Sequence, residues 1–301
     1  MSQYRVKILS GWSMPGGSTS HHISLTNLLN DNGIDCTFYG PHDYHLDKCK
    51  SGSIEVEFRD NIAPGTRIPI LIGNKDLKID TDDVVISHFI QFPIDPEAVY
   101  QGIANPTQAK RHILSLHETN IFPLRHINLQ PYDLIQYVSQ FQKDWHSIDK
   151  ASTIIPPMVE KVKINADFLE VNGKTQRMYT GNAGVIGSID SHKLPHLSIE
   201  RALQDGFRKV LLFGTITDKD YFTKYVTPHM INGSAVLLNH VDDKSAMYSS
   251  IDIVYHSSLR ETYGLVEAEC RLAGIPFNGP ENNQEILEEE EILKRWTNIL
   301  K

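Results

Sequence analysis

Two glutamates, Glu261 and Glu269, flank the start of a segment with a helical pattern. At about 100° per residue, Leu265, Ala268 and Leu272 fall on one apolar face, and Glu269 falls in the middle of that face. A carboxylate on a buried face is costly unless a cation or hydrogen-bond donors meet it. We therefore expect Glu269 either to bind a ligand or to form an internal ion pair, and the pattern alone favours neither.

Glu261 lies just before this helix, which we expect over residues 263–273, and just after a predicted strand over residues 251–256. Open α/β sheets bind ligands at the carboxyl ends of their strands. The backbone N–H groups that can point at an anion there belong to Thr262, Tyr263, Gly264 and Leu265. Carboxylates accept hydrogen bonds from sugar hydroxyls and helix N-termini hold phosphates, so the segment suits a sugar nucleotide. Glu267 and Arg271 are expected to face solvent.

The elements that must position these residues alternate between strand and helix along the chain. Further strands are expected over residues 4–10, 34–39, 83–89, 112–117, 132–139, 179–189, 209–213 and 235–240, with a helix over 196–204. Such alternation predicts parallel sheets with helices on both faces. Because Pro156 and Pro157 interrupt an extended apolar segment, we expect an N-terminal domain over residues 1–155 and a C-terminal domain over residues 156–301, whose last helix can pack back on the first domain.

Composition narrows the functional classes. The chain has 301 residues, 40% hydrophobic and 22% charged, which describes a folded globular protein of about two domains. Its net charge of −8 argues against nucleic-acid binding, which needs a dense basic face. Three scattered cysteines, no signal-peptide pattern and no long apolar run predict a cytoplasmic protein with at most peripheral membrane contact.

The segment from Ser257 to Pro276 closely resembles the signature of retaining glycosyltransferases of family four. It places seven residues between Glu261 and Glu269 within Ser-Leu-x-Glu-x-Tyr-Gly-Leu-Val-x-x-Glu, and it closes with Ala-Gly-Ile-Pro. The resemblance implies the GT-B fold, an α/β architecture of two doubly wound, Rossmann-like domains facing each other across a cleft. It also implies that Glu269 binds the donor ribose and that Glu261 contacts the transferred sugar.

Other parts of the chain resemble the same family. Gly16 and Gly17 match its N-terminal glycine loop, which approaches the donor diphosphate. Leu116-His117-Glu118 is similar to its His-Asp position, so the resemblance implies that His117 orients the sugar or assists proton transfer. Residues 187–193 resemble its Gly-Arg-x-x-x-x-Lys-Gly motif, which implies that Lys193 contacts the diphosphate and places Ser188 at the position of the arginine.

The resemblance implies a retaining, metal-independent glycosyltransferase of the hexosyltransferase type. The donor would be a UDP-sugar or a GDP-sugar, the acceptor a carbohydrate, a lipid or a small molecule, and no cofactor would be needed. No group of histidines, cysteines or acids has the spacing of a metal site, so we expect none.

Departures from the family pattern leave alternatives open. Ser188 removes an expected cation, Leu194 replaces a glycine, His256 replaces a proline, and the segment beyond Pro280 is short for this family. These features would also suit a nucleotide-sugar-binding protein with little or no activity. A sugar-nucleotide epimerase of the same architecture is a further alternative. A nicotinamide dehydrogenase is disfavoured, because no Gly-x-Gly-x-x-Gly follows the first predicted strand.

Overall fold

The structure, a computed structural model, divides into two compact units, which are described separately. The first unit comprises Met1–Met158 and Glu285–Lys301, and the second comprises Val159–Gln284. The described residues are 4–10, 16–40, 53–55, 58–63, 66–71, 79–88, 109–117, 129–130, 132–165, 168–171, 174–282 and 284–301.

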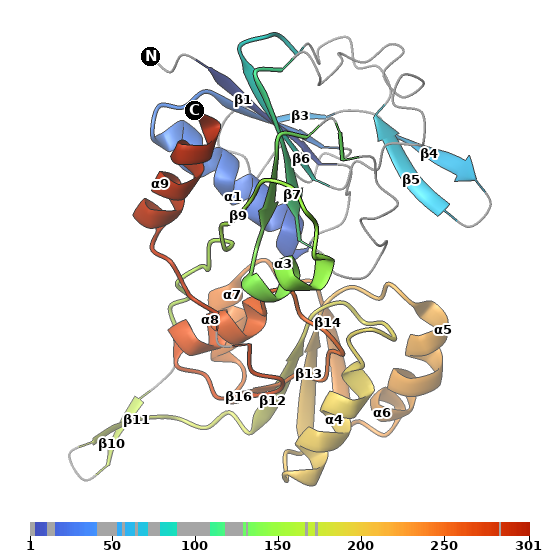
Figure 1. The fold of residues 1–301 in the computed structure, drawn as a ribbon. Coiled ribbons are helices and arrows are strands. Elements are labelled where there is room, and N and C mark those ends of the chain that lie inside the picture. The colour runs from blue at the N-terminus through green and yellow to red at the C-terminus, as the bar shows by residue number, and fades with distance from the viewer. Residues whose placement is uncertain are drawn as a thin grey trace. The chain divides into compact units, whose positions relative to one another are not determined.

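A seven-stranded parallel sheet forms the centre of the first unit, in the order β3-β2-β1-β6-β7-β8-β9 (Figure 1). Its strands are β1 (Arg5–Ser10), β2 (Cys36–Gly40), β3 (Ser53–Glu55), β6 (Asp83–His88), β7 (Arg111–Leu116), β8 (Leu134–Tyr137) and β9 (Ser152–Ile154). β1 pairs with both β2 and β6, so the order of strands reverses beside β1. The central strands are buried along almost their whole length, as expected for a parallel sheet covered on both faces.

The helices of the first unit include one from each end of the described chain. These helices are α1 (Gly17–Asp31), α3 (Gln140–His146) and α9 (Glu289–Leu300). α9 lies beside α1, because Ile292, Trp296 and Leu300 recur every four residues and join the apolar core under α1 (Figure 1). A separate antiparallel pair is formed by β4 (Phe58–Ala63) and β5 (Thr66–Leu71).

The second unit has a five-stranded parallel sheet in the order β14-β13-β12-β15-β16. Its strands are β12 (Asn182–Ile186), β13 (Lys209–Phe213), β14 (Ala235–Asn239), β15 (Ile253–Tyr255) and β16 (Phe277–Asn278). The chain adds β13 and β14 on one side of β12 and then returns to add β15 on the other side. This reversal makes the boundary between β12 and β15 a topological switch point, the place where open α/β sheets bind ligands.

Helices cover both faces of this second sheet. They are α4 (Pro195–Gln204), α5 (Lys219–Tyr221), a π-helical segment (Phe222–Val226), α6 (Thr227–Ile231), α7 (Lys244–Ser249) and α8 (Leu265–Ala273). Alternate residues of β13 enter two different cores: Leu212 packs with α4, and Leu211 packs with α7 and α8. An antiparallel hairpin, β10 (Phe168–Val171) and β11 (Lys174–Arg177), precedes the sheet.

The α/β prediction of two parallel sheets is confirmed, and the errors lie at element ends. The strand predicted over residues 209–213 coincides with β13, whereas the one predicted over 179–189 is the shorter β12. The helix predicted over 263–273 begins later, at Leu265, because Gly264 adopts a left-handed conformation with φ of 81°. Within the described part of the chain, no helix combines the length and the apolar character needed to cross a bilayer.

Candidate functional site

Two loops meet at the switch point of the second unit. One loop follows β12 and contains residues 187–194, and the other follows β15 and contains residues 256–264. Because β12 and β15 are adjacent parallel strands, both loops leave the same edge of the sheet. The backbone N–H of Leu259 donates to the carbonyl oxygen of His192 at 3.2 Å, which ties the two loops together.

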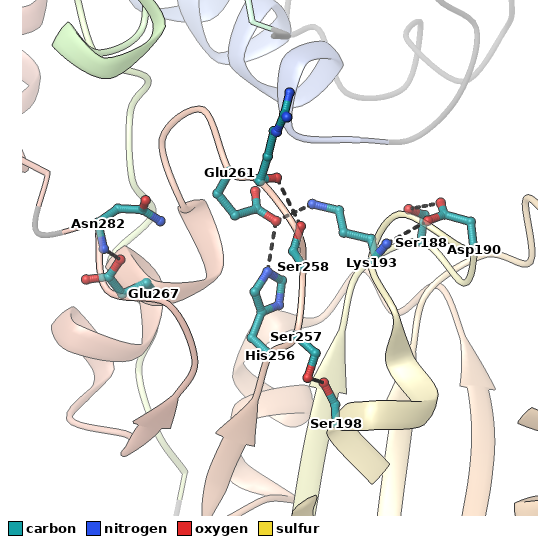
Figure 2. Close-up of polar contacts among 11 residues, drawn as sticks. Ser188, Asp190, Lys193, Ser198, His256, Ser257, Ser258, Glu261, Glu267 and Asn282 are labelled. Atoms are coloured by element: carbon teal, nitrogen blue, oxygen red, sulfur yellow. Dashed lines mark hydrogen bonds and ion pairs between the residues drawn. The ribbon is translucent and has the colours of Figure 1, made fainter. Parts of the chain in front are cut away.

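Glu261 is the meeting point of side chains from both loops (Figure 2). Lys193 Nζ forms an ion pair with Glu261 Oε1. His256 Nε2 donates to the same oxygen at 2.8 Å. The described residues give Oε2 no hydrogen bond, and the side chains of Glu261 and Lys193 keep 16% and 28% of their surface exposed. Oε2 can therefore accept a hydrogen bond from a hydroxyl of a ligand.

The environment of Glu261 keeps its carboxylate ionised. Burial alone would raise the pKa of Glu261, but the hydrogen bond from His256 and the charge of Lys193 lower it to about 2. The site therefore presents an anion and a cation in contact, with a protonated ring nitrogen beside them.

Asp190 holds the loop after β12 in shape. Its Oδ1 accepts from the backbone N–H groups of His192 and Lys193, each at 2.9 Å. Its Oδ2 accepts from Ser188 Oγ at 2.7 Å and from Thr217 Oγ1 at 2.9 Å. These hydrogen bonds outweigh burial and lower the pKa of Asp190. The hydroxyl of Ser188 thus serves the loop, and Asp190 sets the backbone from which Lys193 reaches Glu261.

Close backbone packing fixes the same loop against β13. The N–H of Gly187 donates to the carbonyl oxygen of Phe213 at 2.9 Å. A Cβ added to Gly214 would lie only 1.8 Å from the carbonyl oxygen of Gly187. Glycine is therefore required at Gly214, and the base of the Lys193 loop sits directly on the end of β13.

The start of α8 differs from the sequence prediction in one respect. We expected Glu267 to face solvent, but it is buried, and its Oε2 accepts from the backbone N–H of Asn282 at 2.8 Å. The helical wheel missed this contact because the partner comes from the chain after β16. Around the N-terminus of α8, Tyr263 is buried, and Thr262 and Leu265 are half-buried.

Glu269 lies on the buried face of α8, as predicted, and both of its oxygens have partners. Lys244 Nζ lies 2.6 Å from Oε1, and Tyr248 OH donates to Oε2 at 2.7 Å. Burial opposes a charged Lys244, but the negative charge of Glu269 raises the pKa of Lys244 above its ordinary value. Of the two expected roles, the structure contains the internal ion pair. A ribose would have to share or replace these partners.

The predicted residues of the first unit lie at the carboxyl edge of its own sheet. Gly16 precedes α1 in an extended conformation, Gly17 begins the helix, and both are exposed. Residues 11–15 of the same glycine-rich segment lie outside the described residues. His117 directly follows β7 and is 9% exposed. Burial, followed by the effect of neighbouring histidines, lowers the pKa of His117 well below its usual range.

Sequence reasoning missed several residues that the structure brings together. His256 contacts Glu261 from the end of β15, and its position at a strand end was the one available signal. Asp190 had no motif to mark it. The ring of His117 lies 4.8 Å from those of His21 and His22 and 5.2 Å from that of His88, measured between centroids. His21, His22 and His88 come from segments distant from His117 in sequence, so spacing could not reveal the cluster.

Comparison with known proteins identifies the architecture. No protein-family model matches the chain, and a search of curated protein sequences finds no match. The solved structure of S. aureus TarM in complex with fondaparinux, alpha-GlcNAc-glycerol and UDP matches with a TM-score of 0.62, covering 98% of this chain and 92% of TarM at 13% identity. The pneumococcal O-GlcNAc transferase GtfA, in complex with UDP and GlcNAc, gives a TM-score of 0.63, covering 99% and 91% of the two chains at 9% identity.

The Anabaena protein HepE, in complex with UDP and glucose, gives a TM-score of 0.62, covering 99% of this chain and 90% of HepE at 13% identity. The chain has the GT-B fold. The match covers nearly the full length of each chain, so it includes both parallel sheets and the C-terminal helix. At such low identity the similarity establishes the fold alone, and the chemistry has to be argued from the residues of this chain.

Proposed function

We propose that this protein is a retaining, metal-independent glycosyltransferase of family four, which moves a sugar from a nucleoside diphosphate sugar to a hydroxyl acceptor. The contact between Lys193 and Glu261 at the switch point of the second unit is the observation that carries the proposal. A cation for a diphosphate and a carboxylate for sugar hydroxyls stand together where open α/β sheets bind ligands. The UDP and sugars bound by the similar structures support the same class of donor.

Lys193 and Glu261 would change partners when the donor binds. The diphosphate would take Lys193 Nζ, and sugar hydroxyls would donate to Glu261, beginning at the free Oε2. Backbone N–H groups at the N-terminus of α8, from Thr262 to Leu265, would add donors to the phosphates. The ion pair thus keeps both groups charged and placed before the donor arrives.

The transfer would proceed on one face of the sugar. The bond between the anomeric carbon and the diphosphate oxygen breaks as a bond to the acceptor oxygen forms. The acceptor proton passes to the leaving diphosphate, and Lys193 offsets the charge that develops there. His117 would orient the sugar or assist this proton transfer from the first unit, where its low pKa keeps the imidazole neutral. Gly16 and Gly17 would let backbone approach the diphosphate.

Glu269 would bind the ribose hydroxyls of the donor. Because Lys244 and Tyr248 already occupy its two oxygens, the ribose would share a carboxylate that is held in place from below. UDP is the expected nucleotide and GDP the second choice. The acceptor would be a carbohydrate, a lipid or a small molecule bearing a hydroxyl group, and the donor would need no further cofactor.

A ligand screen followed by product analysis tests the proposal. A ligand at 100 times its dissociation constant raises the free energy of unfolding by about 2.7 kcal/mol, so thermal unfolding with UDP-, GDP- and ADP-sugars identifies the donor. NMR of the product then gives the anomeric configuration, and repetition in EDTA tests for metal dependence. We expect the donor configuration to be retained and EDTA to leave transfer unchanged. Binding without turnover on any acceptor, or release of an epimerised donor, would overturn the proposal.

A further inference from the structure

Four buried histidines gather at the carboxyl edge of the first unit's sheet. His21 and His22 lie in the first turns of α1, His88 ends β6, and His117 follows β7. The ring centroids of His22 and His88 are 4.6 Å apart, and that of His117 lies 4.8 Å from those of both His21 and His22. β1 and β6, the strands at the reversal of this sheet, lie beside the group, since Ser10 Oγ is 3.3 Å from His88 Nδ1.

Three of these side chains can converge on one point. His21, His22 and His117 each offer one ring nitrogen, and these three nitrogens lie within 4.8 Å of one another. All three side chains are buried. Burial lowers the pKa of His21 to about 3 and lowers those of His22 and His117 well below the usual range, so all three rings are neutral at pH 7. A neutral imidazole has one nitrogen lone pair available to a metal ion.

His21 provides the first independent sign of a missing ligand. Neither Nδ1 nor Nε2 of His21 has a hydrogen-bond partner among the described residues, although both atoms are buried. Buried polar groups are nearly always satisfied, because leaving one unpaired forfeits its hydration. An ion at the point of convergence would satisfy one of the two nitrogens.

His22 provides a second sign through its tautomer. Its Nδ1 is 2.8 Å from the carbonyl oxygen of Ser18, and because a carbonyl can only accept, Nδ1 carries the proton. The lone pair is therefore on Nε2, which lies 3.1 Å from Ser115 Oγ. Ser115 donates its single proton to Gln136 Oε1 at 2.6 Å, and Gln136 Nε2 donates to backbone carbonyls, which fixes Oε1 as the acceptor.

The lone pair of His22 Nε2 thus faces a hydroxyl oxygen whose proton points elsewhere. In metal sites a ligating histidine usually donates its other ring N–H to a carbonyl or a carboxylate, and this contact fixes the tautomer. His22 already has that arrangement with Ser18. The hydrogen bonds therefore prepare Nε2 to ligate.

We propose that His21, His22 and His117 form a binding site for a divalent transition-metal ion of the Zn²⁺ class. Zn–N distances of about 2.0–2.1 Å bring ligand nitrogens about 3.3 Å apart, so ring rotations of roughly an ångström would close the triad. Three neutral ligands leave the ion doubly charged and one position open. Hydroxide or a solvent anion would fill that position from the side on which His117 is exposed.

This site is separate from the proposed donor site, which lies in the second unit. It bears on the proposed function at His117, because a nitrogen that holds an ion cannot take a proton. Metal affinity tests the ion site, and transfer in EDTA tests the role of a free His117, so each proposal can fail alone.

Metal titration of the full chain tests the inference. Metal-free protein is titrated with Zn²⁺ by calorimetry and with Co²⁺ by visible absorption, which reports the coordination geometry. We expect one ion per chain, a tetrahedral Co²⁺ spectrum and a higher unfolding temperature with Zn²⁺. His21→Phe keeps a ring in the cluster and removes both nitrogens, and it should weaken Zn²⁺ binding at least 100-fold.

Matched variants separate the site from general effects. His112→Gln removes another buried imidazole from the same sheet, one that contacts Ser87, and should bind Zn²⁺ as the wild type does. Thermal unfolding of each metal-free variant shows that it is folded. Zn²⁺ binding by His21→Phe equal to that of the wild type, or no binding by the folded wild type, would overturn the inference. Zn²⁺ binding by a protein that binds no sugar nucleotide would overturn only the proposed function.

Discussion

Lys193 and Glu261 form an ion pair that joins the loop after β12 to the loop after β15. The pair satisfies both charges in the absence of ligand, and His256 adds a hydrogen bond to the same carboxylate oxygen. A phosphate that takes Lys193 releases Glu261 for hydroxyl groups. Nucleotide binding and sugar binding are therefore coupled through this contact in the proposed mechanism.

Replacing Lys193 with methionine should weaken binding of nucleoside diphosphates specifically. The variant loses the positive charge facing the diphosphate, so the dissociation constant for UDP should rise about tenfold or more, which corresponds to about 1.4 kcal/mol. Uridine, which has no phosphate, should bind equally to both proteins in calorimetry. Lys209→Met is the control, because Lys209 is exposed at the opposite end of the sheet, where β13 begins. Equal losses in both variants would contradict the assigned role.

The stability of the fold should fall in acid through Glu261. Its pKa is about 2 in the folded protein, compared with 4.5 for an unperturbed glutamate. A lowered folded-state pKa stabilises the fold above the unfolded-state value, and that contribution is lost as the pH falls from about 4.5 towards 2. Glu261→Gln should therefore remove up to about 3 kcal/mol of this pH dependence in denaturant titrations.

The control for the acid measurement is Glu200→Gln, since Glu200 is exposed on α4 in the same unit. Its pH profile should match that of the wild type. A Glu261→Gln profile that also followed the wild type would show that the ion pair contributes nothing to stability.

Gly264→Ala should displace the start of α8. A Cβ at Gly264 would lie 2.6 Å from Asn282 Nδ2, and the φ of 81° adds about 1–2 kcal/mol of strain for any other residue. Gly233→Ala has nearly the same φ, 78°, with open space around its Cβ. The Gly264 variant should therefore be less stable than the Gly233 variant in thermal unfolding, and it alone should lose nucleotide affinity. Equal effects would mean that the contact with Asn282 is unimportant.

Lys244→Met should separate the two roles of Glu269. Removing one member of a buried ion pair leaves a charge without its partner, and because Lys244 is 32% exposed we expect a loss of about 1–3 kcal/mol in unfolding free energy. The Glu269 carboxylate remains, so UDP should still bind to the folded variant. Glu269→Gln keeps the size of the side chain and should weaken UDP binding more than Lys244→Met does. The opposite order would assign Glu269 to the fold alone.

The sequence was sufficient for the architecture because the relevant signals are local. Alternating apolar strands and amphipathic helices predicted two parallel sheets, and the spacing of Glu261 and Glu269 placed both acids around one helix start. Glu269 was predicted on a buried face by periodicity alone, and it is buried between Lys244 and Tyr248.

Contacts between distant segments were beyond sequence reasoning. Glu267 was assigned to solvent because the wheel includes only its own helix, whereas its partner, Asn282, comes from the chain after β16. His256 looked like a loss from the family pattern, and it proved to be a hydrogen-bond donor to Glu261. The cluster around His117 depends on the pairing of β1, β6 and β7, which no short spacing in the sequence encodes.

The central claim is that Glu261 acts on the transferred sugar, and single-turnover transfer with Glu261→Gln tests it most directly. Wild-type and variant protein are supplied with the donor found in the ligand screen, and the rate of sugar transfer and the affinity for the free nucleoside diphosphate are measured separately. The account predicts a fall in transfer of about 100-fold or more, with nucleotide affinity unchanged or tighter, because Lys193 no longer has a competing carboxylate. Transfer at the wild-type rate by the variant would contradict it.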